Sequence, residues 1–263
     1  MKQHKNTWMA ILILLTLIFS AVNVTPASAV WIFANKTTAH GLGSNTVNGV
    51  FASGSTLYAA TDGGLSISTD GGSSFINKTT NDGLGNNIVY DVFASGSTVY
   101  AGTAYGVSIS ADGGGSFINK TTANGLGSNG VPGVFASAGI IYAATTGGLS
   151  ISTDGGASFN NKTTTNGLGS NWVYGVFISG GMIYAATTGG LSISTNGGST
   201  FANRTTANGL GDNLVRGVFV SGTTVYAATN GGLSISVNGG ASFTNKTTAN
   251  GLGHNIVYGV FAI

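Results

Sequence analysis

The sequence has no cysteine and no glutamate, only two prolines, and few charged residues, which make up 6% of its 263 positions. Without cysteine there is no disulfide framework, no thiol chemistry and no zinc site of the cysteine type. Such low charge beside 42% apolar residues and 45 glycines is typical of neither a disordered tail nor a helical bundle. Short runs of Val, Ile, Phe and Tyr alternate with Gly, Ser, Thr and Asn, which predicts an all-β fold.

The first 29 residues have the organisation of a secretory signal peptide. Lys2 and Lys5 precede an apolar run at residues 8–19, and a stretch of small residues ends at Ala29. A bilayer span needs roughly 20 apolar residues, so this run is too short for one. We therefore expect cleavage after Ala29, no membrane insertion afterwards, and a secreted or periplasmic protein.

The remaining residues, 30–263, form one predicted repeat domain without excess charge. They carry seven Lys or Arg and seven Asp, a formal net charge of zero. Nucleic-acid binding requires clustered Lys and Arg, so this balance argues against it.

The whole domain is built from copies of one 42-residue unit. The tripeptide Gly-Leu-Gly recurs at this spacing, beginning at Gly41, Gly83, Gly125, Gly167, Gly209 and Gly251. Each unit contains four β-prone runs separated by turn residues, as in residues 87–95, 97–103, 106–112 and 116–122. Alternation in residues 64–68 predicts that Leu65 and Ile67 face one way and Ser66 and Ser68 the other.

A four-stranded meander repeated at this length predicts a blade of a β-propeller, because one small sheet cannot bury both of its faces alone. The alternative is an open β-solenoid. We expect five complete blades and a partial sixth, with residues 31–38 as a fourth strand and residues 257–263 as a first strand. The ends are compatible with a closed five-bladed ring with frayed ends, an open arc, or a truncated copy of a longer chain. Unpaired strands at the ends would also permit self-association.

The turn between the third and fourth runs has a recurring pattern. Residues 68–75 read Ser-Thr-Asp-Gly-Gly-Ser-Ser-Phe, and the pattern returns at 110–117, 152–159, 194–201 and 236–243. It resembles the Asp-box, or BNR, repeat of sialidases, xyloglucan-cleaving glycosidases and sortilin-type receptors, with Phe where those families usually have Trp. That resemblance implies a propeller fold.

The sequence of these loops predicts a structural role rather than a catalytic one. The acceptor side chain can bond backbone N–H groups two residues on, while the Phe anchors the loop in the sheet stack. In two units Asn replaces Asp, which keeps an acceptor oxygen but removes the acid. The predicted structural positions are Asp70, Phe75, Asp112, Phe117, Asp154, Phe159, Asn196, Phe201, Asn238 and Phe243.

The other half of the unit, from Gly-Leu-Gly through Leu-Tyr-Ala-Ala-Thr-Asp-Gly-Gly-Leu-Ser at residues 57–66, resembles the two-component regulator propeller repeat of periplasmic ligand-sensing domains. This resemblance also implies a propeller. Neither resemblance fixes an activity.

No set of residues predicts catalysis. Sialidase-type chemistry needs an Arg cluster, a Tyr nucleophile and an acid, yet Arg204 and Arg216 are the only arginines. Other glycosidases need two facing carboxylates. We therefore expect no enzyme, no catalytic residue, no metal site and no cofactor.

His40 and His254 are interpreted as solvated loop residues. Six Asn-Lys/Arg-Thr triplets match the N-glycosylation acceptor pattern, but we interpret them as a repeated strand end.

The units differ most at the start of the first run. The positions on either side of a constant Val vary, and being two apart they share a face of the strand. We expect a shallow aromatic ligand site at the channel rim, although the same side chains could instead fill space between blades. Its residues would be Tyr90, Trp172, Tyr174, Arg216 and Tyr258.

The sequence therefore predicts a non-catalytic secreted binding module whose partner is a carbohydrate or another extracellular ligand, including a protein. One alternative is an extracellular or envelope scaffold. The other is a sialidase-like glycosidase relative.

Overall fold

The computed structural model describes residues 34–262, which build five sheets of four antiparallel strands each. The signal peptide predicted at residues 1–29 lies outside the described residues. In every sheet the strands pair in chain order, as a meander, with no crossover. The predicted all-β fold with five complete four-stranded units is confirmed.

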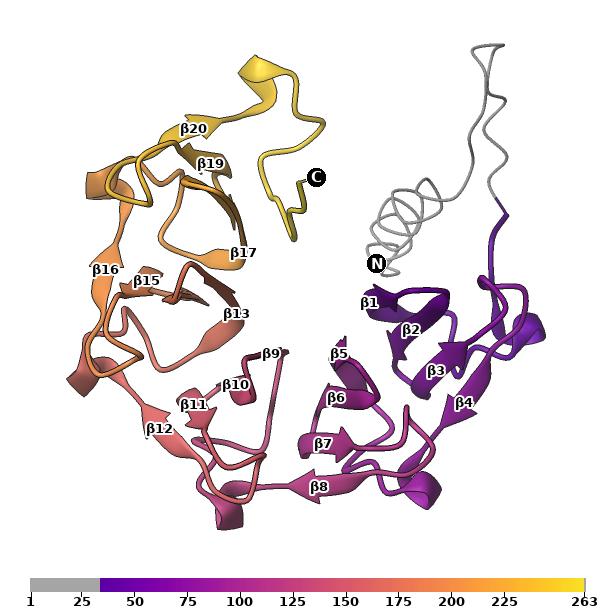
Figure 1. Ribbon diagram of the computed structural model, residues 1–263. Coiled ribbons are helices and arrows are strands. Elements are labelled where there is room, and N and C mark those ends of the chain that lie inside the picture. The colour runs from indigo at the N-terminus through magenta and orange to yellow at the C-terminus, as the bar shows by residue number, and fades with distance from the viewer. Residues whose placement is uncertain (1–33, 263) are drawn as a thin grey trace, which may run out of the picture. The chain divides into compact units, whose positions relative to one another are not determined.

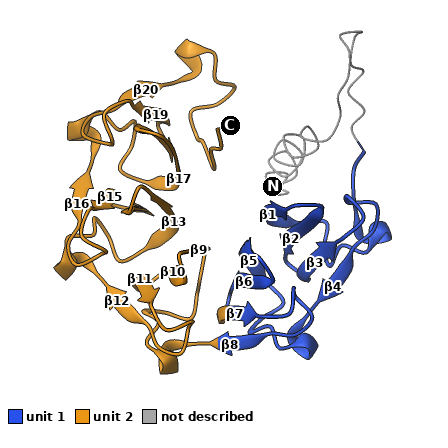
Figure 2. Ribbon diagram, viewed as in Figure 1, with its two compact units in different colours: residues 1–104, 108–119 blue, residues 105–107, 120–263 orange. Residues whose placement is uncertain are grey.

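The described chain falls into two compact units, coloured separately in Figure 2. Unit 1 comprises residues up to 104 and residues 108–119, and unit 2 comprises residues 105–107 and the chain from residue 120 onward. The boundary thus passes through two strands, β7 and the last residue of β8. The sheets of unit 1 contain β1 (Val47–Ser53), β2 (Thr56–Thr61), β3 (Gly64–Ser68) and β4 (Ile76–Lys78), then β5 (Val89–Ser95), β6 (Thr98–Thr103), β7 (Gly106–Ser110) and β8 (Ile118–Lys120).

Unit 2 has three sheets of the same form. They contain β9 (Gly133–Ser137), β10 (Ile140–Thr145), β11 (Gly148–Ser152) and β12 (Asn160–Lys162); β13 (Val173–Ser179), β14 (Met182–Thr187), β15 (Gly190–Ser194) and β16 (Ala202–Arg204); and β17 (Val215–Ser221), β18 (Thr224–Thr229), β19 (Gly232–Ser236) and β20 (Thr244–Lys246). The first strands β9, β13 and β17 are neighbours, and β12, β16 and β20 lie on the outside of this unit (Figure 1). This is how the blades of a β-propeller are arranged.

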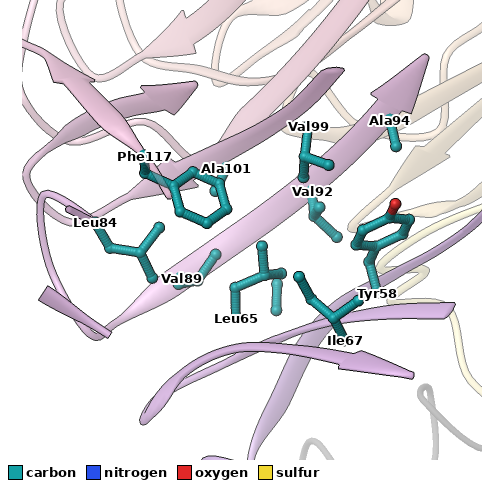
Figure 3. Packing of buried hydrophobic residues seen from close by; sticks show 11 residues of the cluster. Tyr58, Leu65, Ile67, Leu84, Val89, Val92, Ala94, Val99, Ala101 and Phe117 are labelled. Carbon is teal, nitrogen blue, oxygen red and sulfur yellow. The ribbon is translucent and has the colours of Figure 1, made fainter. Parts of the chain in front are cut away.

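Neighbouring sheets pack face to face through a repeated apolar interface. In unit 1, Tyr58, Leu65 and Ile67 of the first sheet meet a group from the second sheet that includes Val99 and Phe117 (Figure 3). The equivalent residues meet twice in unit 2, where Tyr142, Leu149 and Ile151 face the next sheet, as do Tyr184, Leu191 and Ile193. As expected, Leu65 and Ile67 enter the core while Ser66 and Ser68 hydrogen bond on the other face.

A short 3₁₀ helix between sheets was not predicted from the sequence. The six helices are η2 (Thr38–His40), η3 (Thr80–Asp82), η4 (Thr122–Asn124), η5 (Thr164–Asn166), η6 (Thr206–Asn208) and η7 (Thr248–Asn250). In η3 the Thr79 hydroxyl accepts from Asn81 N, the Asp82 carboxylate accepts from Thr79 N, and Gly83 ends the helix at φ 94°. Only glycine adopts that conformation readily. The expected fourth strands are therefore only three residues long, because the Thr-Thr pair turns into this helix.

The two ends of the chain differ from the expected strands. Residues 31–33 lie outside the described part, residues 34–37 form no strand, and Thr38 begins η2. Residues 257–262 also form no strand, but Val257 N donates to Thr229 O at 2.9 Å. The Phe261 ring lies 4.9 Å from the Phe219 ring, the same spacing as Phe219 from Phe177. This segment therefore follows β17 as β17 follows β13.

Candidate functional site

The first strand of four sheets contains a β-bulge near its start. In β13 the pairing shifts between Val173 and Gly175, so Tyr174 has no partner in the ladder. The same shift occurs in β1, β5 and β17 and leaves out Asn48, Tyr90 and Arg216. A bulge re-aims the extra side chain, and bulges are frequent next to functional sites. In the remaining sheet Pro132 occupies this position, and β9 begins only at Gly133.

The bulge of β13 places two aromatic rings together. The ring centroids of Trp172 and Tyr174 are 6.0 Å apart, while Val173 between them is fully buried. Trp172 is fixed through its backbone, since its N–H donates to Ser170 Oγ at 3.1 Å and its carbonyl accepts from Thr188 N. The sequence prediction placed both side chains on one face of a regular strand. In the structure Trp172 instead precedes β13 and Tyr174 is the bulged residue.

Arg216 lies between two tyrosines of unit 2. Its guanidinium carbon is 4.8 Å from the centroid of the Tyr258 ring and 6.0 Å from that of the Tyr174 ring. Both distances are within the range of a cation–π contact. Its Nε donates a hydrogen bond of 2.7 Å to Asn230 Oδ1, which fixes the orientation of the guanidinium.

Trp172, Tyr174, Arg216 and Tyr258 therefore form one continuous group in unit 2, which we call the aromatic–arginine surface. Trp172 is 47% exposed and Tyr258 is 41% exposed, whereas Tyr174 and Arg216 are half-buried. Of the five residues predicted for a ligand site, the structure brings these four together. The fifth, Tyr90, is exposed at the bulge of β5 in unit 1.

The sequence analysis missed the residues that hold this surface in place. Asn230 orients Arg216, and Ser170 and Thr188 fix the Trp172 backbone, joined to each other by a hydroxyl hydrogen bond of 2.7 Å. The spacing in the sequence could have indicated Asn230. It stands fourteen residues after Arg216, in the turn between the second and third strands. Asn48 donates to Asp62 Oδ1 across the same interval in unit 1.

The loops between the third and fourth strands, at residues 68–75, 110–117, 152–159, 194–201 and 236–243, are here called the serine–acceptor loops. In the first, Ser68 Oγ donates to Asp70 Oδ1 at 2.7 Å and accepts from Gly72 N at 2.8 Å. Asp70 also accepts from Ser74 N, at 3.0 Å. The Asp thus bonds the N–H group four residues on, not two as expected, because the serine hydroxyl takes the nearer N–H.

The two loops with Asn keep the same arrangement. Asn196 Oδ1 accepts from Thr200 N at 3.0 Å, and its Nδ2 donates to Thr200 Oγ1 at 2.9 Å. The direction of the side-chain bond is reversed, since in the Asp loops the hydroxyl donates to the carboxylate. The five loop phenylalanines are buried: Phe75, Phe117, Phe159, Phe201 and Phe243. All five also join repeats through the backbone; Phe159 N, for example, donates to Asn124 O.

Hydrogen bonds hold the pKa of each loop aspartate well below its usual range. The main contribution is the Ser74 backbone N–H at Asp70, the Ser110 hydroxyl at Asp112 and the Ser158 hydroxyl at Asp154. These carboxylates remain ionised at any ordinary pH.

Two further groups of polar residues make internal contacts. Asn161 Oδ1 accepts from Ser150 Oγ at 2.9 Å and its Nδ2 donates to Gly147 O at 2.9 Å, so this sequon amide is engaged within its sheet. His254 is exposed in a loop, as expected, whereas His40 is half-buried at the end of η2. His40 Nδ1 accepts from Thr37 N at the start of η2, and His254 Nδ1 accepts from Ile256 N.

Residues 34–262 lack two kinds of feature. That part of the chain contains no group of three or more His, Asp or Glu side chains able to hold a metal ion. It also contains no helix long and apolar enough to cross a membrane.

No protein-family model matches the chain, and no curated protein matches it. Among solved structures, the chain is similar to the extracellular domain of the putative one component system BT4673 from B. thetaiotaomicron, with a TM-score of 0.69 and 17% identity over 85% of this chain and 31% of that one. It is also similar to an ancestral GH74 enzyme, with a TM-score of 0.64 and 21% identity over 80% of this chain and 32% of that one.

A third similar structure is YCF48 bound to D1 peptide, with a TM-score of 0.57 and 17% identity over 80% of this chain and 70% of that one. The chain spans about a third of the length of the first two structures. Because identities are low, these likenesses establish the β-propeller fold and carry no activity with them.

Proposed function

We propose that this protein is an exported, non-catalytic binding module that takes sugar rings on the aromatic–arginine surface. The observation that carries the proposal is the contiguous order of Trp172, Tyr174, Arg216 and Tyr258, with each member within 6.0 Å of the next. The C–H face of a sugar ring packs on an aromatic face while its hydroxyls stay hydrated. Trp and Tyr suit such a surface, since each combines a flat apolar body with a polar edge.

The exposure of these rings favours binding over the alternative role of filling space between blades. Space-filling side chains of this protein are nearly fully buried, as Tyr184 and Leu191 are. Trp172 and Tyr258 instead leave more than two fifths of their surface accessible. An aromatic ring exposed to that degree gives the fold little burial energy and is available to a ligand.

The hydrogen bonds of the Asp carboxylates support a binding module that has no catalytic activity. Hydrolysis of a glycosidic bond by the common mechanism needs two carboxyl groups facing one another, one of them a protonated acid. Asp70, Asp112 and Asp154 are instead bound in their own loops with lowered pKa values. Beside the proposed site, Asp212 Oδ1 accepts from Leu214 N. No metal or cofactor is part of this proposal.

Export is supported by the signal-peptide pattern of residues 1–29 and by the likeness to an extracellular domain. The lack of a basic cluster supports a partner other than nucleic acid. In this proposal the serine–acceptor loops are Asp-box turns that hold the blades together, as their resemblance implies. The partner class that fits best is an extracellular carbohydrate.

The proposal is tested by displaying the purified protein on a glycan array and comparing it with the Trp172→Ala/Tyr174→Ala double variant. We expect binding by the parent protein and a loss of about tenfold or more in the variant, because each stacking ring contributes on the order of 1 kcal/mol. The Val237→Ala variant serves as a control, since Val237 is exposed but lies in a serine–acceptor loop.

The control variant should bind as the parent does, and all three proteins should have the same melting temperature. A parent protein that binds no glycan contradicts the proposal and favours the scaffold alternative. So does a double variant that folds and binds unchanged.

A further inference from the structure

We propose that the ligand is an acidic oligosaccharide whose carboxylate is bound by Arg216. This inference rests on the proposed function, because it assigns a ligand class to the same surface. Uronate sugars have this chemistry: a ring that can stack on Trp172 or a tyrosine, and a planar carboxylate beside it.

The charge of Arg216 is uncompensated within the described structure. The residues at the equivalent position of the six repeats are Asn48, Tyr90, Pro132, Tyr174, Arg216 and Tyr258, and Arg216 is the one charged member. The ion pair of Lys78 with Asp82 does not involve Arg216. Its hydrogen-bond acceptor is the neutral amide of Asn230. A half-buried cation without a counter-ion favours an anionic partner.

The geometry of the guanidinium suits a planar carboxylate. An arginine side chain has five N–H donors in one plane, and Arg216 uses one of them, at Nε, for Asn230. The centroid of the Tyr258 ring lies 4.8 Å from the guanidinium carbon, so the Arg216 side chain packs against an aromatic ring. The remaining donors form a planar fork that matches both oxygens of a carboxylate.

The extent of the surface favours more than one sugar unit. The Tyr174 and Tyr258 rings both lie within 6.0 Å of the Arg216 guanidinium carbon, and the Trp172 ring lies 6.0 Å from the Tyr174 ring. A carboxylate at Arg216 therefore has more than one ring nearby. An oligosaccharide fills this surface, whereas a small acid occupies only the part beside Arg216.

Arg204 provides a matched comparison. It is also a half-buried arginine of unit 2, but it belongs to the outermost strand β16, and its Nε donates to the backbone carbonyl of Gly240. Lys occupies this position in the other repeats. Removing either charge changes the net charge of the protein equally, yet only one of the two lies at the proposed site.

The test uses oligomers of galacturonate, mannuronate and alternating glucuronate, each beside a counterpart whose carboxyl groups have been reduced to alcohols. Binding is measured by calorimetry with the parent protein and the Arg216→Gln, Arg216→Lys and Arg204→Gln variants. We expect at least one acidic oligomer to bind about 10- to 100-fold more tightly than its reduced form, the effect of a charged hydrogen bond. Arg216→Gln should lose this preference, Arg216→Lys should keep part of it, and Arg204→Gln should behave as the parent.

Each other outcome overturns the inference. If acidic and reduced oligomers bind equally and Arg216→Gln has no effect, the carboxylate assignment is wrong while the proposed sugar-binding function stands. If none of these oligomers binds but the parent protein binds other sugars on the glycan array, this inference is wrong and the proposed function stands; if nothing binds in either experiment, both are wrong. Preferential binding of acidic peptides over every uronate would identify a protein partner instead. Equal losses in Arg216→Gln and Arg204→Gln would show a non-specific effect of charge.

Discussion

At the scale of single residues, the acceptor position of the serine–acceptor loops shows what the fold requires. A carboxylate at Asp154 and an amide at Asn196 both accept from the backbone N–H four residues on, at 3.0 Å. Both also bond the hydroxyl of the same residue, although the donor and acceptor exchange roles. The loop therefore needs an oxygen on a short side chain, and it does not need a charge.

A pair of substitutions in one loop tests this requirement. Asp154→Asn should leave the melting temperature close to that of the parent, because Asn forms the same bonds in two natural copies. Asp154→Ala should lower it clearly, because Ser158 N loses its acceptor. Differential scanning calorimetry measures both variants. Equal melting temperatures for the two would show that the acceptor oxygen has no role in stability.

The lowered pKa values of the loop aspartates predict a dependence on acid. At Asp70, Asp112 and Asp154 the folded protein holds the carboxylate ionised at a pH where the unfolded chain takes up protons. Their contribution is therefore complete above the ordinary carboxyl pKa of about 4 and is lost as the pH falls below it. Urea unfolding midpoints should decrease between pH 6 and pH 3.

Charge variants of the loops provide the control for this pH dependence. The Asp70→Asn/Asp112→Asn/Asp154→Asn variant should have a flatter profile than the parent, since its loops no longer titrate. The Asn196→Asp/Asn238→Asp variant should have a steeper one. A triple variant with the profile of the parent would assign the acid sensitivity to other groups.

At the scale of elements, the second glycine of three serine–acceptor loops, Gly114, Gly198 and Gly240, lies close to an isoleucine of the preceding sheet. A Cβ atom on Gly198 would lie 2.6 Å from Ile151 Cδ1 of the preceding sheet, and its φ is 83°. Gly197 has a comparable φ of 68°, but a Cβ atom there would meet nothing within 4 Å. The two glycines therefore separate the effect of backbone strain from the effect of contact.

Alanine at these two positions should have different effects on stability. Gly197→Ala carries only the strain of a positive φ, on the order of 1 kcal/mol. Gly198→Ala adds overpacking against Ile151, for a total of about 2–4 kcal/mol. Chemical denaturation measures both, and adding Ile151→Val to Gly198→Ala should restore part of the loss. Equal losses in the two single variants would exclude the contact between sheets as the cause.

Short elements were the hardest to predict from the sequence. The four strands of a unit follow from alternation and from Gly-Gly turns, because these patterns concern neighbouring residues. The 3₁₀ helices were assigned to strands, although Thr79 followed three residues later by Asp82 and then Gly83 is a capping pattern. The bulge at Tyr174 depends on the register of two strands, which one strand alone does not reveal. Variation at position 174 was visible in the sequence, whereas its link with Arg216 depends on how neighbouring sheets pack.

At the scale of the whole molecule, the five sheets share one repeat pattern, but equivalent residues in them are buried to different degrees. Leu191 of β15 is fully buried because the sheet of β17–β20 covers it. Leu233 holds the same position in β19, yet it is only half-buried. In a repeat protein the stability of each unit depends largely on its neighbours, so equivalent substitutions have unequal effects.

Leucine-to-alanine substitutions at these two positions should reveal this difference. Leu191→Ala should lower the free energy of unfolding by about 2–5 kcal/mol, the range for a buried leucine. Leu233→Ala should have a smaller effect, because Leu233 buries less apolar surface. Denaturant unfolding of the full chain measures both values. A Leu233→Ala variant as unstable as Leu191→Ala would show that β19 is covered in solution by a surface absent from residues 34–262.

Under the proposed function, the β-bulge separates ligand contact from the architecture of the sheet. Its extra residue makes no cross-strand pair, so Asn, Tyr or Arg can occupy that place while the flanking valine and glycine keep the ladder unchanged. Since the unit is copied at a constant length, a side chain that works in one copy can be transplanted to another at the same geometry. New specificity then arises by combining interchangeable residues on a constant frame, one substitution at a time, without remodelling any loop.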